Sequence, residues 1–131
     1  MKTTATKLLF ITLTVFLLTG CKKVGKTYDA YFYTAIETTD SHLILELDNK
    51  IIGEVPLLKT TLSTNNDTII NQALHLKLRT GKYKISVRDN NGNVKCSGIL
   101  KFRFNNFNGA TNPGVLEHAM KDNVLVTRIH F

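Results

Sequence analysis

Residues Leu74–Phe104, LHLKLRTGKYKISVRDNNGNVKCSGILKFRF, carry the clearest structural pattern in the chain. Apolar and polar residues alternate along three runs, which are separated by Thr80-Gly81 and by Asn91-Gly92. Alternation of this kind is typical of a β-strand with one buried face. Asn-Gly is a strong hairpin signal because both residues tolerate the positive φ of a type I′ turn. The stretch therefore predicts a three-stranded antiparallel meander, with one apolar side, as the centre of the fold.

Cys96 falls on the apolar side of this pattern, together with Val94 and Leu100. A buried thiol behaves as a small hydrophobe, so we expect Cys96 to be structural and unreactive. The other cysteine in the chain is Cys21. An intermolecular disulfide through Cys96 is the less favoured alternative.

Further strands are expected on both sides of the meander. Four segments combine aromatic, β-branched or alternating apolar residues and each predicts a strand: Ala30–Glu37, His42–Asp48, Ile51–Val55 and Asn123–Phe131. Loops are expected over Lys59–Asn71 and Asn105–Gly114, and a short helix over Val115–Lys121. Short strands with turn signals between them predict an all-β domain, either a small antiparallel β-sandwich or an open barrel.

The N-terminus has the features of an export signal. Lys2 and Lys7 precede an uncharged apolar run, Leu8–Leu18, that is shorter than the ~20 residues needed to span a bilayer. The following residues complete the motif Leu18-Thr19-Gly20-Cys21, which resembles the lipobox of bacterial lipoproteins. The resemblance implies that Cys21 receives a diacylglycerol thioether, becomes the mature N-terminus and carries further acyl chains such as palmitate.

This resemblance sets the expected organisation of the chain. Residues 1–20 form the signal peptide, 21–28 the lipidated cysteine and a tether, and 29–131 a single domain. The protein is expected in the bacterial cell envelope, anchored by lipid to the outer or the cytoplasmic membrane. No cofactor is expected apart from the covalent lipid on Cys21. The alternatives are an ordinary signal peptide with an unmodified cysteine, or an uncleaved anchor.

The domain also contains two segments with family-like motifs. Leu45–Leu57 reads LELDNKIIGEVPL, and Leu78–Val87 reads LRTGKYKISV. Together they resemble the PEGA family of small envelope β-sandwich modules, although Asn49 replaces the usual turn glycine and some twenty residues separate the segments. The resemblance implies an immunoglobulin-like or PEGA-like sandwich and says nothing specific about a ligand.

Charge is unevenly distributed along the chain. It has 17 Lys and Arg against 10 Asp and Glu, a formal net charge of +7. Acids are concentrated between Thr27 and Thr68, and bases between Leu74 and Phe104. Seven bases fall on the side of the meander opposite its apolar residues and predict one basic face: Lys77, Arg79, Lys84, Arg88, Lys95, Lys101 and Arg103.

Like charges that face each other across strands are mildly destabilising, so such a face calls for an explanation. The first interpretation is a solvated surface that discourages aggregation, and the second is a surface neutralised by the acidic first half, including Glu46 and Asp48. The third interpretation is an anionic partner, namely lipid headgroups, an envelope polymer or an acidic protein. Nucleic acid is not expected, because the strands lack interleaved exposed aromatics for base stacking.

No motif for catalysis or metal binding is visible in the sequence. Asp89–Asn93 looks like the start of a calcium loop, but Val94 and Leu100 stand where that loop needs Gly and Glu. The four histidines have no metal-ligand spacing: His42, His75, His118 and His130. There is no nucleophile elbow and no glycine-rich phosphate loop. We therefore expect a protein that is not an enzyme and holds no metal.

These observations predict a membrane-anchored envelope lipoprotein that acts as a non-enzymatic binding or scaffolding module. The alternative is an inhibitor or immunity lipoprotein that neutralises a toxin or hydrolase in the envelope, which rests on size, export and anchoring alone. An enzyme ranks third, and would need a pocket lined by His42, Asp40 or Glu117.

Overall fold

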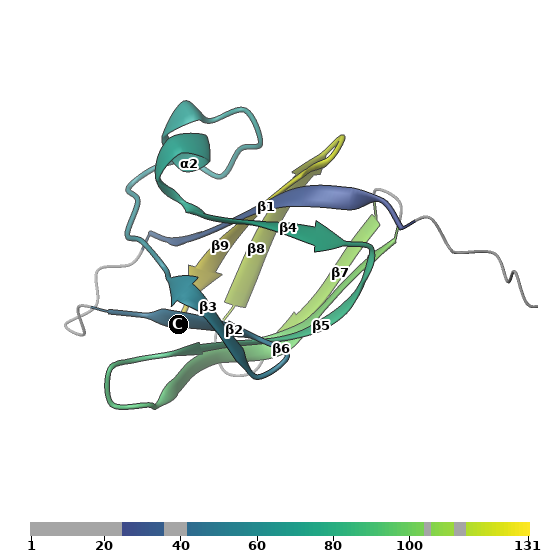
Figure 1. Ribbon diagram of the computed structural model, residues 1–131. Helices are drawn as coiled ribbons and strands as arrows, with labels where there is room; N and C mark the ends of the chain where they lie inside the picture. Colours follow the sequence, from purple (N-terminus) through teal and green to yellow (C-terminus); the bar gives the residue numbers. More distant parts are fainter. Residues whose placement is uncertain (1–24, 36–41, 104–105, 112–114) are drawn as a thin grey trace, which may run out of the picture.

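A computed structural model describes residues 25–35, 42–103, 106–111 and 115–131 (Figure 1). The strands are β1 (Thr27–Thr34), β2 (Ile44–Leu47), β3 (Lys50–Glu54), β4 (Leu74–Arg79), β5 (Gly81–Arg88), β6 (Val94–Arg103), β7 (Asn106–Thr111), β8 (Val115–Lys121) and β9 (Val124–His130), and the helix is α2 (Asp67–Gln72). The predicted all-β class is confirmed. β1 begins at Thr27, so the last two residues of the predicted tether belong to the sheet.

The strands form two sheets that pack face to face (Figure 1). The first sheet has the order β4-β1-β9-β8, and the second has the order β3-β2-β5-β6-β7. Neighbouring strands are antiparallel except β1 and β9, which run parallel. The fold is therefore a β-sandwich, one of the two predicted architectures.

The predicted meander is wrong in one of its pairings. β5 and β6 form the expected hairpin, but β4 pairs with β1 in the first sheet. The chain thus changes sheet at Thr80, between Arg79 and Gly81. Alternation shows which side of a strand is buried, and the pattern is the same whether the next strand lies beside it or in the facing sheet.

Val115–Lys121 is strand β8 and not the predicted short helix. β8 pairs with β9 over its whole length, from Val115 opposite His130 to Lys121 opposite Val124. Backbone pairing with a neighbouring strand outweighs the helix propensity of Leu, Glu, Ala and Met in this segment.

Two segments predicted as loops contain regular structure. Asn106–Thr111 is edge strand β7, which pairs with β6. Asp67–Gln72 forms α2, and the side chain of its N-cap residue Asn66 accepts a hydrogen bond from the backbone N–H of Thr68 at 3.0 Å. Asn is a preferred N-cap, but a helix of 6 residues is too short to display a periodic apolar pattern in the sequence.

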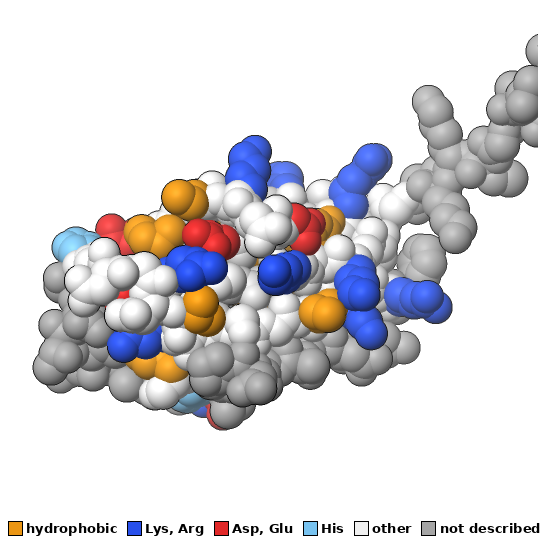
Figure 2. Space-filling view, turned by 90° about the horizontal axis from the view of Figure 1, so that it is seen from below, with side chains coloured by type: hydrophobic (Ala, Val, Ile, Leu, Met, Phe, Trp, Pro, Cys, Tyr) orange, Lys and Arg blue, Asp and Glu red, His pale blue; other side chains and the backbone are white. Residues whose placement is uncertain are grey.

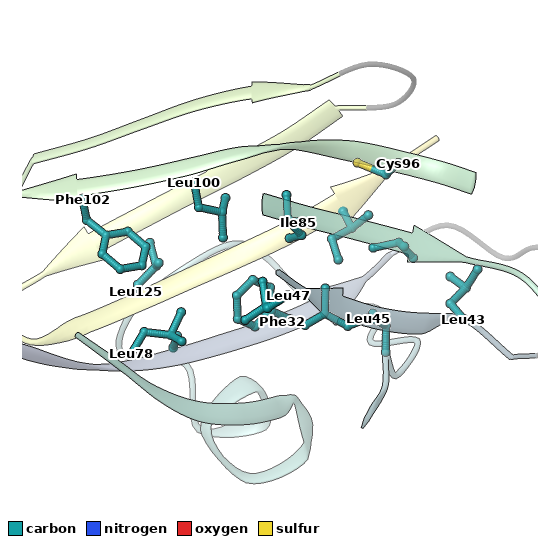
Figure 3. Packing of buried hydrophobic residues seen from close by; sticks show 14 residues of the cluster. Phe32, Leu43, Leu45, Leu47, Leu78, Ile85, Cys96, Leu100, Phe102 and Leu125 are labelled. Carbon is teal, nitrogen blue, oxygen red and sulfur yellow. The ribbon is translucent and has the colours of Figure 1, made fainter. Parts of the chain in front are cut away.

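The main core lies between the two sheets (Figure 3). Its fully buried members come from both sheets: Ala30, Phe32, Leu45, Ile85, Val87, Cys96, Leu100, Leu125 and Ile129. The predicted burial of Cys96 is confirmed, and it forms no disulfide. Burial raises the pKa of its thiol to about 11, which suits a structural role.

A second, smaller cluster lies on the outer side of the first sheet, beneath α2 (Figure 1). Ile69 of α2 packs with Leu58, Tyr33 and Val126, all of which are buried. The helix therefore covers part of a sheet face that would otherwise expose apolar residues, and this part of the face is closed to a ligand.

The β2–β3 and β5–β6 hairpins of the second sheet turn differently. Asp48 and Asn49 between β2 and β3 both have positive φ, 50° and 63°, as in a type I′ turn. Between β5 and β6 Gly92 has a φ of 81° and its N–H donates to the carbonyl of Asp89 at 3.0 Å. The type I′ turn expected at Asn91-Gly92 is therefore replaced by a longer turn that ends in a left-handed glycine.

Candidate functional site

The seven bases predicted to share one face are divided between the two sheets. Lys77 and Arg79 lie on β4, at the outer face of the first sheet. The other five lie on β5 and β6, at the outer face of the second sheet: Lys84, Arg88, Lys95, Lys101 and Arg103. The prediction of a single face is wrong for Lys77 and Arg79, because the chain changes sheet directly after them.

Two of the five bases on the second sheet are neutralised by nearby acids. Arg88 Nε donates to Glu46 Oε2 at 3.1 Å, from β5 to the adjacent β2. Lys95 Nζ lies 3.4 Å from Asp89 Oδ2 across the β5–β6 hairpin. For Arg88, the interpretation in which the acidic first half offsets the basic charge is therefore confirmed, whereas the partner of Lys95 comes from the basic stretch itself.

The Asp89 carboxylate is fully engaged within its hairpin. Oδ1 accepts the backbone N–H groups of Asn91 and Asn93 at 2.9 Å, and Oδ2 accepts the Asn93 side-chain amide at 3.1 Å. Burial acts to raise the pKa of Asp89, but the hydrogen bonds from Asn93, Lys95 and Asn91 together lower it. The segment Asp89–Asn93, which resembled the start of a calcium loop, is therefore a turn held together by the Asp89 carboxylate.

Four bases at the other end of the second sheet are exposed: Lys82, Lys84, Lys101 and Arg103. Lys82 stands directly opposite Lys101 in the β5–β6 pair, a position in which two like charges repel. Within the described parts of the chain, none of the four makes an ion pair with an acid. We call these four residues the basic cluster.

Lys82 was not among the predicted face residues. Lys82 follows Gly81, which was predicted as part of a turn. Alternate residues of a strand lie on the same side, so Lys82 lies on the same side of β5 as Lys84. This alternation could have identified Lys82 from the sequence. Figure 2 shows Lys and Arg side chains spread over this face, with a few acidic and apolar side chains between them.

An open hollow of about 480 Å³ lies within this face. Its walls come from the β2–β3 turn and from the middle of β5 and β6: Asp48, Lys82, Lys84, Ser97, Gly98 and Ile99. Asp48 Oδ1 accepts the backbone N–H of Lys84 at 2.8 Å, which fixes the turn against β5. The hollow thus offers ammonium groups to an anion and contains no paired nucleophile and base.

On the outer face of the first sheet, by contrast, acids and bases of neighbouring strands form pairs. Arg128 Nε of β9 donates to Glu117 Oε2 of β8 at 2.8 Å, and His130 Nε2 lies 3.0 Å from the same oxygen. These contacts lower the pKa of Glu117. On β4, Lys77 Nζ lies 3.8 Å from Asp29 Oδ1 of β1.

Of the three residues named for a possible enzyme site, the two that the structure describes are not brought together. His42 pairs with Glu54 at 2.5 Å near the second sheet, whereas Glu117 lies on the outer face of the first. Asp40 lies outside the described residues. Among the described residues no group of three His, Cys, Asp or Glu side chains could hold a metal ion.

The lipidation site at Cys21 also lies outside the described residues. No helix in the described ranges is both long and apolar enough to cross a membrane. Comparison of the chain with protein-family models, with curated proteins and with solved structures found no match. The candidate site therefore rests on the geometry of the second sheet.

Proposed function

We propose that the protein is a lipid-anchored component of the bacterial envelope whose β-sandwich binds an anionic partner without catalysing a reaction. The observation that carries this proposal is the basic cluster: four exposed cations on one sheet face, two of them directly opposite each other, with no described acid in an ion pair with them. The anchor rests on the lipobox at Leu18–Cys21.

Electrostatics supports a binding role for the cluster. Cross-strand repulsion between Lys82 and Lys101 costs a fraction of a kcal/mol, and an anion seated between them would remove this cost. The lysines act as point charges, while the planar guanidinium of Arg103 suits a bidentate contact with phosphate or carboxylate. Phosphate, sulfate and carboxylate groups are therefore the expected ligand chemistry.

The anchor is tested by changing the lipidated residue. Cys21→Ala should move the protein from the membrane fraction to the aqueous fraction of the envelope, because the acyl chains supply the hydrophobic binding energy. Mass spectrometry of the N-terminal peptide should find Cys21 with a diacylglyceryl group. A wild-type Cys21 without a diacylglyceryl group would contradict the lipid anchor.

Binding is tested by capture from an envelope extract with residues 22–131, at low and at high salt. The triple variant Lys84→Glu, Lys101→Glu and Arg103→Glu should lose the captured partner and remain folded with a cooperative thermal transition, because all three side chains are exposed. Unchanged capture would overturn the role of the cluster. A single protein retained at both salts would instead favour the inhibitor or scaffold interpretation.

A further inference from the structure

The chain enters the sandwich beside the point at which it later changes sheet. The backbone N–H of Thr80 donates to the carbonyl of Lys26 at 2.9 Å, and Thr27 stands opposite Arg79 in the β1–β4 pair. In Figure 1 the start of β1 and the arrowhead of β4 lie at the same end of the molecule. We call this the entry end.

Basic side chains are concentrated at the entry end. Arg79 is the last residue of β4, Lys82 lies at the start of β5, and Lys101 stands opposite it. Arg103 is the last residue of β6, and Lys26 precedes β1 with its ammonium 5.3 Å from the centre of the Tyr28 ring. Four cations of the two sheets, together with Lys26, therefore lie around the place where the chain leaves towards Cys21.

The acids that pair with bases on the second sheet lie at the other end of its strands. Arg88 ends β5 and Lys95 lies near the start of β6, and these two contact Glu46 and Asp89. Three acids lie nearer the entry end. Asp29 is the third residue of β1 and pairs with Lys77 and His75 of β4. Asp48 is bonded to the backbone of β5, and Asp122 follows Lys121 in the β8–β9 turn. Bases exceed acids there, so the domain has one strongly positive end.

The length of the tether keeps this end close to the membrane. Cys21 precedes Lys26 by five residues, and an extended chain spans at most about 3.6 Å per residue, or roughly 18 Å in all. Charge attraction fades over about 8 Å at physiological salt, so the entry end can reach the range in which headgroup charge acts.

We propose that the entry end, through Lys82, Lys101 and Arg103 with Lys26 and Arg79, binds the anionic phospholipid headgroups of the membrane that holds the lipid anchor. This proposal rests on the proposed function for the anchor and names the anionic partner. The acyl chains would hold the domain at the membrane, and the basic residues would then add electrostatic attraction to the same surface. The domain then stands with its strands pointing away from the membrane and the α2 side and the β5–β6 hairpin free for other contacts.

The test uses residues 22–131, which contain every strand of both sheets and both core clusters. Binding is measured by co-sedimentation with vesicles of phosphatidylglycerol mixed with phosphatidylethanolamine, and with vesicles of phosphatidylcholine alone. We expect binding to the anionic vesicles that weakens at high salt, and none to phosphatidylcholine. Because this chain has no acyl group, the result is independent of whether Cys21 is lipidated.

A matched pair of variants locates the binding surface. Each Lys or Arg near an anionic surface strengthens binding about fivefold, so Lys82→Gln, Lys101→Gln and Arg103→Gln together should weaken it about a hundredfold. The control, Lys59→Gln, Arg88→Gln and Lys95→Gln, removes the same charge away from the entry end and should change binding severalfold at most. Thermal midpoints of both triple variants show that the fold is kept.

Three outcomes would overturn this assignment. Failure of the wild-type chain to bind anionic vesicles would exclude the lipid partner. Equal losses in the two triple variants would show attraction by net charge and not by the entry end. Capture of an anionic polymer or acidic protein with no vesicle binding would refute the lipid assignment and leave the proposed binding function standing.

Discussion

His118 is a titratable residue placed where its charge is unfavourable. It lies on the inner side of β8, with Nδ1 3.0 Å from Thr127 Oγ1, and burial lowers its pKa to about 4. The unfolded chain binds a proton there at its ordinary pKa of 6.5. Between pH 6.5 and about 4 the unfolded state therefore holds a proton that the folded state excludes, and acid favours unfolding.

We expect the free energy of unfolding to fall by up to about 3 kcal/mol as the pH drops through this window, at about 1.4 kcal/mol per unit. Urea unfolding at a series of pH values measures the slope, and His118→Gln should flatten it. Glu117 has a lowered pKa, so its protonation reduces the free energy of unfolding only at more acidic pH, below 4.5. An unchanged slope in the glutamine variant would contradict the burial of a neutral His118.

The Cys96 thiol is predicted to be unreactive in the folded protein. Its thiol is fully buried with a pKa of about 11, so only about one molecule in a thousand carries a thiolate at pH 8. In residues 22–131 a thiol reagent should therefore react only as fast as the domain unfolds. Rapid labelling of the native protein, at a rate that denaturant does not increase, would show that the core is open at Cys96.

At the scale of the elements, α2 offers a matched pair of adjacent isoleucines. Ile69 is fully buried against the first sheet, whereas Ile70 is 41% exposed. Ile69→Ala should lower the stability by about 3 kcal/mol, because it leaves a cavity, and Ile70→Ala by about 0.5 kcal/mol. Chemical denaturation of the two variants measures both values. Similar losses would mean that α2 does not pack on β1 and β9 as described.

The β5–β6 pair contains a repulsion that one substitution should relieve. Lys101→Glu places an acid directly opposite Lys82 and should raise the stability by about 0.5 kcal/mol at low salt. The gain should shrink as salt screens the repulsion in the wild type and the attraction in the variant. Thermal melts at two ionic strengths would measure this change. A loss of stability at low salt would show that the two lysines do not face each other. The proposed anion binding predicts that the same change weakens affinity, so that the wild-type lysine would exchange stability for affinity.

At the scale of the whole molecule, the strands could be predicted from the sequence but their partners could not. Alternation is local, so it located β5 and β6 well, whereas the assignment of β4 to the first sheet depends on contacts with β1, far away along the chain. The Glu117–Arg128 contact was missed for a related reason. It exists only because residues 115–121 form a strand, which places Glu117 opposite Arg128.

The candidate site was predicted in part for the same reason. The positions of Lys84, Lys101 and Arg103 follow from period two and were found, and pairing of Arg88 with Glu46 was one of the open interpretations. The separation of Lys77 and Arg79 from the rest depends on where the chain changes sheet. No local pattern distinguishes that crossing from a tight turn.

The parallel pairing of β1 with β9 has a consequence for the order in which the domain can form. The Thr34 hydroxyl donates to the carbonyl of Ile129 at 2.9 Å, across 95 residues of chain. The central β1–β9 pair of the first sheet can therefore form only after β9 has been synthesised. Pairing of strands so far apart in the sequence gives a high contact order, which slows folding. A chain that ends before Val124 should remain unfolded by circular dichroism. A nascent chain should likewise stay unfolded, and able to pass through an export channel, until β9 has been synthesised.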